Sequence, residues 1–269
     1  MFSKLTWPAL MFVAACLLIS CKKNDNPTPT ESGSLRIEFD NVVGDENLVL
    51  NSKTYRNAAG EEFTVSKLDY FVSNFVLYDD KGNSFTIPQD SSYFLIREDE
   101  KSSQYVTLNQ IPFADYVAVE FMVGVDSARS ASPIEKRKGV LDPGENPSHH
   151  GMYWSWNAGY IFLKLEGSSD AATSANSKFS YHIGLYGGYH EPTVNNTRVV
   201  RVEFGHDKAT VSSTKVPLVH LFADVLKIFD GPGTQLKISE INSIAAERAQ
   251  EAAQVADNYA QMFTYDHTH

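Results

Sequence analysis

The sequence predicts a mainly β protein, with an antiparallel β-sandwich or a barrel-like domain as the fold class. Short runs rich in aromatic and β-branched residues recur through most of the chain, and Gly, Pro, Asn and Asp separate them. The chain has 269 residues, and without its first 20 residues it has a length that one all-β domain can have. No internal repeat is visible. We therefore expect one β-rich domain, covering residues 35–269.

The first 20 residues have the pattern of a targeting segment. Lys4 precedes an apolar run, residues 5–19, which is short for a membrane span and ends at Leu18-Ile19-Ser20-Cys21. This ending resembles a bacterial lipobox, in which Cys21 becomes lipidated after cleavage before it. The alternative is an ordinary secretory signal with an incidental cysteine. Lipidation predicts a membrane-anchored protein of the cell envelope, at the outer membrane, on a periplasmic or surface face that the sequence leaves open.

The elements of the predicted domain follow in chain order. Residues 21–34 are polar and rich in Pro, Ser and Thr, which predicts a flexible tether. Asp79-Asp80-Lys81-Gly82-Asn83 is typical of a hairpin turn. The predicted strands are residues 35–39, 63–65, 68–78, 84–87, 93–96, 116–123, 160–165, 179–185, 199–204 and part of 219–229.

Two stretches depart from the strand pattern. Residues 124–150 are polar and contain three prolines, which predicts a long mid-chain loop. Residues 239–262 place Ile, Ala, Val and Tyr at helical spacing, so we expect a C-terminal helix with Ser239 as its N-cap. Residues 263–269 follow as a histidine-bearing tail.

Charge and cysteine content exclude several functions. The formal net charge is −10, which argues against nucleic acid as a partner. The chain has two cysteines, Cys16 in the targeting segment and Cys21 at the lipobox, so the folded domain has no thiol. Any transition-metal site there must use imidazole, thioether or carboxylate ligands.

Histidines are the candidate metal ligands. His267 and His269 lie two residues apart, so on an extended backbone both side chains project to one side and can bind one ion. His182, in the middle of a predicted strand, is the candidate third imidazole, and three imidazoles suit copper or zinc. A frayed polar terminus, or part of a tag, is the alternative for the pair. Adjacent His149 and His150 form a secondary candidate. The remaining histidines, His190, His206 and His220, are expected to be structural or solvated.

Trp154 and Trp156 lie two residues apart in the stretch from Gly151 to Gly167. If this stretch is one strand, both indoles are on the same face, where oxidative or metal chemistry could use them. Packing in the sandwich is the alternative role. The chain lacks a P-loop, a dinucleotide fingerprint and a Gly-x-Ser-x-Gly motif, and we expect no enzymatic activity.

Several motifs in this order resemble the MbnP-like family of methanobactin-associated copper-binding proteins. They are Thr64-Val65-Ser66-Lys67-Leu68-Asp69-Tyr70-Phe71, Gly124-Val125-Asp126, Leu141-Asp142-Pro143, the Trp154-Ser155-Trp156-Asn157-Ala158-Gly159 block and Tyr181-His182-Ile183-Gly184. The resemblance implies a β-rich domain with a mononuclear copper ion held by histidines. It also implies that a MauG/MbnH-type di-haem partner oxidises a tryptophan, here Trp154 or Trp156, to kynurenine. Founding members can carry an N-terminal His-x-His, whereas residues 33–70 here contain no histidine.

Together these observations predict a lipid-anchored copper-binding protein that captures or buffers copper and is not itself an enzyme. A metal-free binding or surface-interaction module of the same fold is the alternative. A metal-dependent enzyme is a third reading, and it requires an open coordination position and a substrate cleft.

Overall fold

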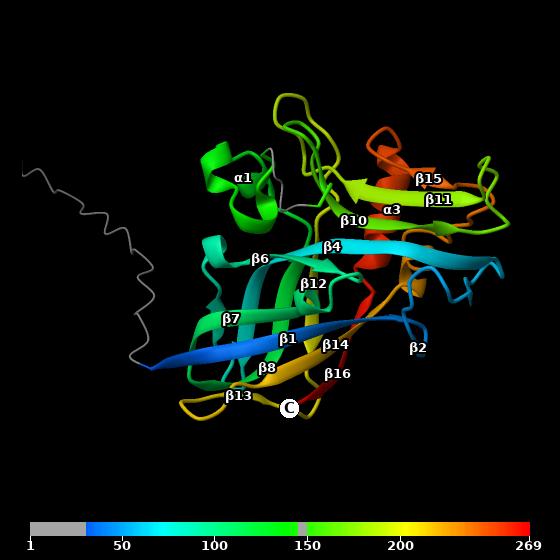
Figure 1. Cartoon of the computed structure of the whole chain (residues 1–269). Helices are drawn as coiled ribbons and strands as arrows, with labels where there is room; N and C mark the ends of the chain where they lie inside the picture. The colour runs from blue at the N-terminus through cyan, green and yellow to red at the C-terminus, as the bar shows by residue number, and fades with distance from the viewer. Residues whose placement is uncertain (1–30, 145–149) are drawn as a thin grey trace, which may run out of the picture. The chain divides into compact units, whose positions relative to one another are not determined.

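The computed structural model describes residues 31–144 and 150–269, which form a mainly β domain of two sheets (Figure 1). This confirms the predicted fold class. Most strand pairs are antiparallel, but β1 pairs with β14, and β11 with β15, in parallel. None of the helices among these residues has the length and apolar character that crossing a membrane requires. Cys21 and the predicted signal peptide lie outside the described residues.

The described residues contain sixteen strands and three α-helices, with short 3-10 turns between them. The strands are β1 (Ser32–Val43), β2 (Glu46–Asn47), β3 (Tyr55–Arg56), β4 (Glu62–Asp79), β5 (Ser84–Thr86), β6 (Tyr93–Arg97), β7 (Tyr105–Pro112), β8 (Ala114–Val123), β9 (Tyr153–Ser155), β10 (Gly159–Ser168), β11 (Lys178–Gly184), β12 (Arg198–Glu203), β13 (Ala209–Val211), β14 (Leu218–Asp224), β15 (Ser243–Ile244) and β16 (Phe263–Thr268). The helices are α1 (Ser127–Ser130), α2 (Leu226–Phe229) and α3 (Ala249–Tyr259).

The smaller sheet has the strand order β16-β14-β1-β2, with β7 also paired to β1. Leu35, Ile37 and Phe39 of β1 are fully buried, whereas the alternate Arg36 and Glu38 face solvent. This alternation is expected of a sheet that has one buried face and one solvent-exposed face. The histidines of β14 and β16 therefore have a solvent-facing surface available to them.

The larger sheet is built around the long strand β4, in the order β12-β8-β4-β10-β11-β15. One face of β4 packs on the smaller sheet, where Tyr70 contacts Phe39 and Phe263 edge-on. The other face carries Phe71, which belongs to a second apolar cluster with Tyr160 and other residues near α1. Both faces of this sheet are thus covered over part of its length.

The C-terminal helix is shorter than predicted. Only α3 is helical, and the stretch before it contains β15, which pairs with β11. Ser239 is not an N-cap, because its backbone N–H and its hydroxyl both donate to the Glu61 carboxylate. Tertiary pairing here overrides the helical spacing of the sequence.

Two more boundaries differ from prediction. β1 begins at Ser32, so the last residues of the predicted tether belong to the first strand. The predicted tail, residues 263–269, is for the most part strand β16, anchored by the nearly buried Phe263. The predicted mid-chain loop contains α1 and two 3-10 turns over its described residues.

Candidate metal centre

The candidate centre lies where β14 and β16 run side by side. In β14 the side chains of Val219 and Leu221 are buried, and His220 between them is on the solvent-facing side. His267 of β16 is directly opposite His220. His269 continues the pairing, since its backbone N–H donates to the carbonyl of Leu218 at 2.9 Å. Strand alternation thus brings three imidazoles to one face.

A β-bulge adds a carboxylate to this face. His220 is opposite His267, but the next residue, Leu221, is opposite Tyr265, so Asp266 is an extra residue in β16. A bulge places two residues of one strand against a single residue of its partner, and this changes the direction of the bulged side chain. Asp266 therefore joins His220 and His267 on one face instead of pointing away from them.

The side chains form a continuous chain of contacts. Asp266 Oδ2 accepts from Nδ1–H of His220 at 2.8 Å and from Nδ1–H of His267 at 2.7 Å. The other ring nitrogen of His267, Nε2, lies 2.7 Å from Nε2 of His269. Because the His267 proton is on Nδ1, its Nε2 presents a lone pair to His269. His220, Asp266 and His267 are also the described His, Cys, Asp and Glu side chains whose ligand atoms cluster closely enough to hold one ion.

Electrostatics favour a cation at this cluster. The hydrogen bonds from His220 and His267 lower the pKa of Asp266, so the carboxylate is ionised at neutral pH. A second carboxylate, that of Asp40 on β1, lies 3.5 Å from His220 Nε2. The side chain of His220 is 12% exposed and that of His267 is 42% exposed. His220 is therefore held by the surrounding side chains, whereas His267 is accessible to an ion from solution.

His182 does not join the terminal pair. It lies on β11 of the larger sheet, which Figure 1 places far from the C-terminal end of the chain. Its Nε2 contacts Glu166 Oε1 at 2.7 Å, and Lys164 is its cross-strand neighbour. Burial lowers the pKa of His182; the contact with Glu166 opposes this shift, and Lys164 reinforces it. The structure therefore does not bring His182 together with His267 and His269, as the three-histidine prediction required.

Trp154 and Trp156 do not share a strand face. The stretch folds as a hairpin, in which Trp154 belongs to β9 and Trp156 to the turn before β10, whose first residue, Gly159, adopts φ +76°. Trp154 packs over Gly184, at which a Cβ atom would come within 2.7 Å of the indole. Trp156 is 42% exposed and stacks on the buried Arg137 guanidinium, 4.0 Å from its ring centre.

The other histidine candidates divide as follows. His149 lies outside the described residues. His150 is exposed in a turn with φ +49° and belongs to no cluster of candidate ligands among the described residues. His220, expected to be structural or solvated, is instead a member of the candidate centre. In the sequence, the alternation of His220 with the apolar Val219 and Leu221 indicated that its side chain faces solvent. No comparable pattern indicated the direction of Asp266, because a bulge interrupts the alternation of the strand.

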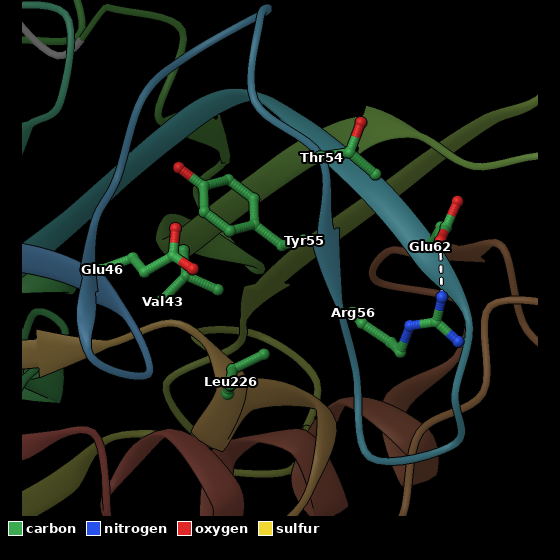
Figure 2. A pocket seen from close by; sticks show the side chains of 7 residues that line it. All are labelled: Val43, Glu46, Thr54, Tyr55, Arg56, Glu62 and Leu226. Carbon is green, nitrogen blue, oxygen red and sulfur yellow. Dashed lines mark hydrogen bonds and ion pairs between the residues drawn. The ribbon is translucent and has the colours of Figure 1, made fainter.

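A polar cavity of about 540 Å³ lies apart from these histidines (Figure 2). Tyr55, Arg56 and Leu226 are among its lining residues, and Arg56 is paired with Glu62 at 2.6 Å. No histidine lines it. The cavity therefore adds no imidazole or thiol ligand to the metal centre.

Fold and site together define a mainly β protein with a candidate histidine–carboxylate metal centre. The family model for MbnP matches residues 32–247, and the chain belongs to the MbnP family. This confirms the resemblance found in the sequence, and the family is associated with copper and methanobactin. His220 lies within the matched residues, but Asp266, His267 and His269 lie beyond them.

Among solved structures, MbnP from Methylosinus trichosporium is similar, with a TM-score of 0.54 and 16% sequence identity. The similarity covers 81% of this chain and 82% of that one. At this identity the likeness establishes the shared fold. The comparison with curated proteins gave no match.

Proposed function

We propose that this protein binds one copper ion outside the inner membrane, through Nε2 of His267 and Nε2 of His269. Asp266 fixes the ring of His267 from behind, and His220 fixes Asp266. The observation that carries the proposal is the 2.7 Å separation of the two ring nitrogens. At this distance the two nitrogens share one proton in a hydrogen bond, and a metal ion would take the place of that proton between them.

Donor chemistry favours copper. Imidazole and carboxylate donors suit Cu(II), and the described residues contain no thiol to compete. The 2.7 Å separation of the two nitrogens is that of a hydrogen bond between the rings, so it shows that the rings converge and does not distinguish one coordination geometry from another. On its donor set, Cu(II) is the ion that we propose.

Capture or buffering of copper, and not catalysis, is the role that we propose for the centre. Asp266 engages both imidazoles through Nδ1, an arrangement in which a carboxylate orients a metal-binding ring. Trp154 and Trp156 belong to the larger sheet and its turn, so the proposed copper ligands include no kynurenine. Exposed Trp156 is the tryptophan that a MauG/MbnH-type di-haem partner would reach.

The copper proposal is tested by titrating the full-length apoprotein with Cu(II) and measuring bound metal by elemental analysis. We expect one equivalent, which the double variant His267→Ala/His269→Ala loses. The matched control is His190→Ala/His206→Ala, which removes two exposed histidines elsewhere and should keep the copper. One equivalent retained in the first double variant would contradict the proposal and favour the metal-free binding module for this end of the chain.

Anchoring is a separate part of the proposal and rests on the sequence from Leu18 to Cys21. Lipidation of Cys21 would hold the domain at a membrane through its tether. Cys21→Ser should release the protein into the soluble fraction or leave it unprocessed, as cell fractionation and intact mass will show. An unchanged mass together with unchanged membrane partition would disprove lipidation.

A further inference from the structure

A second cavity, on the other side of the larger sheet from the smaller one, is lined by three cations. It has a volume of about 520 Å³ and lies beside α1, where Arg129, Lys136 and Lys138 line it together with Val140 and Leu141. The whole chain carries a net charge of −10, so three cations around one cavity are a local exception. Such a concentration of positive charge selects for an anion.

The deepest cation is rigidly held. The side chain of Arg129 is only 8% exposed, and its guanidinium donates to the backbone carbonyl of Lys136. It also lies over the ring of Tyr93, 5.0 Å from the ring centre. The Asp126 carboxylate accepts from the backbone N–H of Arg129 and from the Tyr93 hydroxyl, which fixes the floor of the cavity. Arg129 is therefore presented to the cavity in one orientation.

The cavity already binds one carboxylate, its own Asp90. This side chain is 84% exposed, yet it forms an ion pair with Arg129. The hydrogen bond and charge of Arg129 lower the pKa of Asp90, and the charges of Lys136 and Lys138 contribute to the same shift. Among the ion pairs of the described residues, that of Arg129 with Asp90 is the one that involves a cation of this cavity. Three cations thus act on a single exposed, displaceable carboxylate.

The uncharged part of the cavity wall is apolar, and it indicates that the ligand has an apolar group besides its anionic one. Val140 is half-buried and Leu141 is buried, and both contribute apolar surface to the cavity. An inorganic anion would leave this surface in contact with water, whereas an apolar group on the ligand would cover it. The cavity therefore combines one nearly buried cation, two exposed cations and an apolar wall.

We propose that this cavity binds a small organic carboxylate with an apolar body, whose carboxylate takes the place of Asp90 on Arg129 while Lys136 and Lys138 close over it. The α1 side of the molecule and the C-terminal end of the chain lie far apart in Figure 1, so this site is independent of the copper centre.

The test uses the full-length protein and hexanoate as the probe, with hexanol and inorganic phosphate as comparisons, by calorimetry or NMR titration. Because the internal carboxylate competes with the ligand, Asp90→Asn should tighten hexanoate binding by roughly fivefold, a modest factor because the Asp90–Arg129 pair is open to solvent on its carboxylate side. The double variant Lys136→Gln/Lys138→Gln should weaken binding by a similar factor or more. Lys215→Gln/Lys227→Gln removes the same charge from exposed positions outside the cavity and should change nothing.

The opposite signs of the two effects make the test specific. Hexanoate binding that is absent, or unchanged in both cavity variants, would overturn the proposal. Hexanol binding as tightly as hexanoate would also overturn it, because the cations would then have no role. Tighter binding of phosphate than of hexanoate would replace the organic carboxylate by an inorganic anion. Each cavity variant should keep its copper equivalent, so a failure here is separable from a failure of the copper proposal.

Discussion

An imidazole contacts a carboxylate on both sheets of the protein, but the surroundings of the two contacts differ. On the larger sheet, His182 contacts Glu166, and Lys164, whose ammonium donates to the Gly151 carbonyl, is its cross-strand neighbour. On the smaller sheet, Asp266 links two imidazoles, a third follows, and the neighbouring charge is the carboxylate of Asp40. An imidazole–carboxylate contact is thus not sufficient for a metal site. The number of imidazoles distinguishes the two, as does the sign of the further charge beside each imidazole–carboxylate pair: Lys164 on the larger sheet and Asp40 on the smaller one.

The largest expected difference between the two sheets is tested by removing one imidazole from each, His269 from the smaller sheet and His182 from the larger one. His269→Ala should lower the Cu(II) affinity by roughly a hundredfold, since a structural metal site distributes its binding free energy over a few ligands. His182→Ala should leave the affinity unchanged. Competition titration against a chelator of known affinity measures both. Equal losses in the two variants would mean that the sheets do not differ as proposed.

A smaller effect is expected from the carboxylate that orients the ring. Asp266→Asn keeps the size of the side chain but removes the charge that holds both Nδ1–H groups. We expect a loss of about tenfold in Cu(II) affinity, the usual effect of losing such a partner. Asp40→Asn is the matched control, because its 3.5 Å contact to His220 is longer. A larger loss in Asp40→Asn than in Asp266→Asn would contradict the assigned role of Asp266.

The smallest effect concerns the pH dependence of folding. Burial lowers the pKa of His182, so as pH falls below ~6.5 the unfolded chain takes up a proton before the folded one does. Stability attributed to neutral His182 is therefore complete above that pH and is lost as pH falls to the folded-state pKa. His182→Gln should make the free energy of unfolding less dependent on pH between 7.5 and 5.5, by ~1 kcal/mol or less. Urea unfolding at the two pH values measures this, and the exposed His206→Gln serves as control.

The strands were predictable where burial alternates along a single segment. Residues 35–39 show this, because Leu35, Ile37 and Phe39 all point into the core. The helix was overextended because the residues before α3 pair with β11, an interaction between segments some 60 positions apart. Local spacing carries no information on such pairing.

The candidate centre was predictable in part for the same reason. The His267 and His269 pair followed from spacing on an extended backbone, and both imidazoles do meet. The histidine that lies beside this pair could not be chosen from the sequence, because it depends on which strand pairs with β16, and that strand is β14 with His220. Asp266 was missed because a bulge is set by strand pairing and not by sequence alternation.

The parallel pairing of β1 with β14 has a consequence for the order of folding. It joins residues near position 40 to residues near position 220, and β14 in turn supports β16. Contacts of such large sequence separation form late, because the entropy of loop closure has to be overcome first. The surface that presents His220, Asp266 and His267 is therefore among the last to be completed. A half-folded chain would present these side chains separately, and they would converge only when the domain is whole.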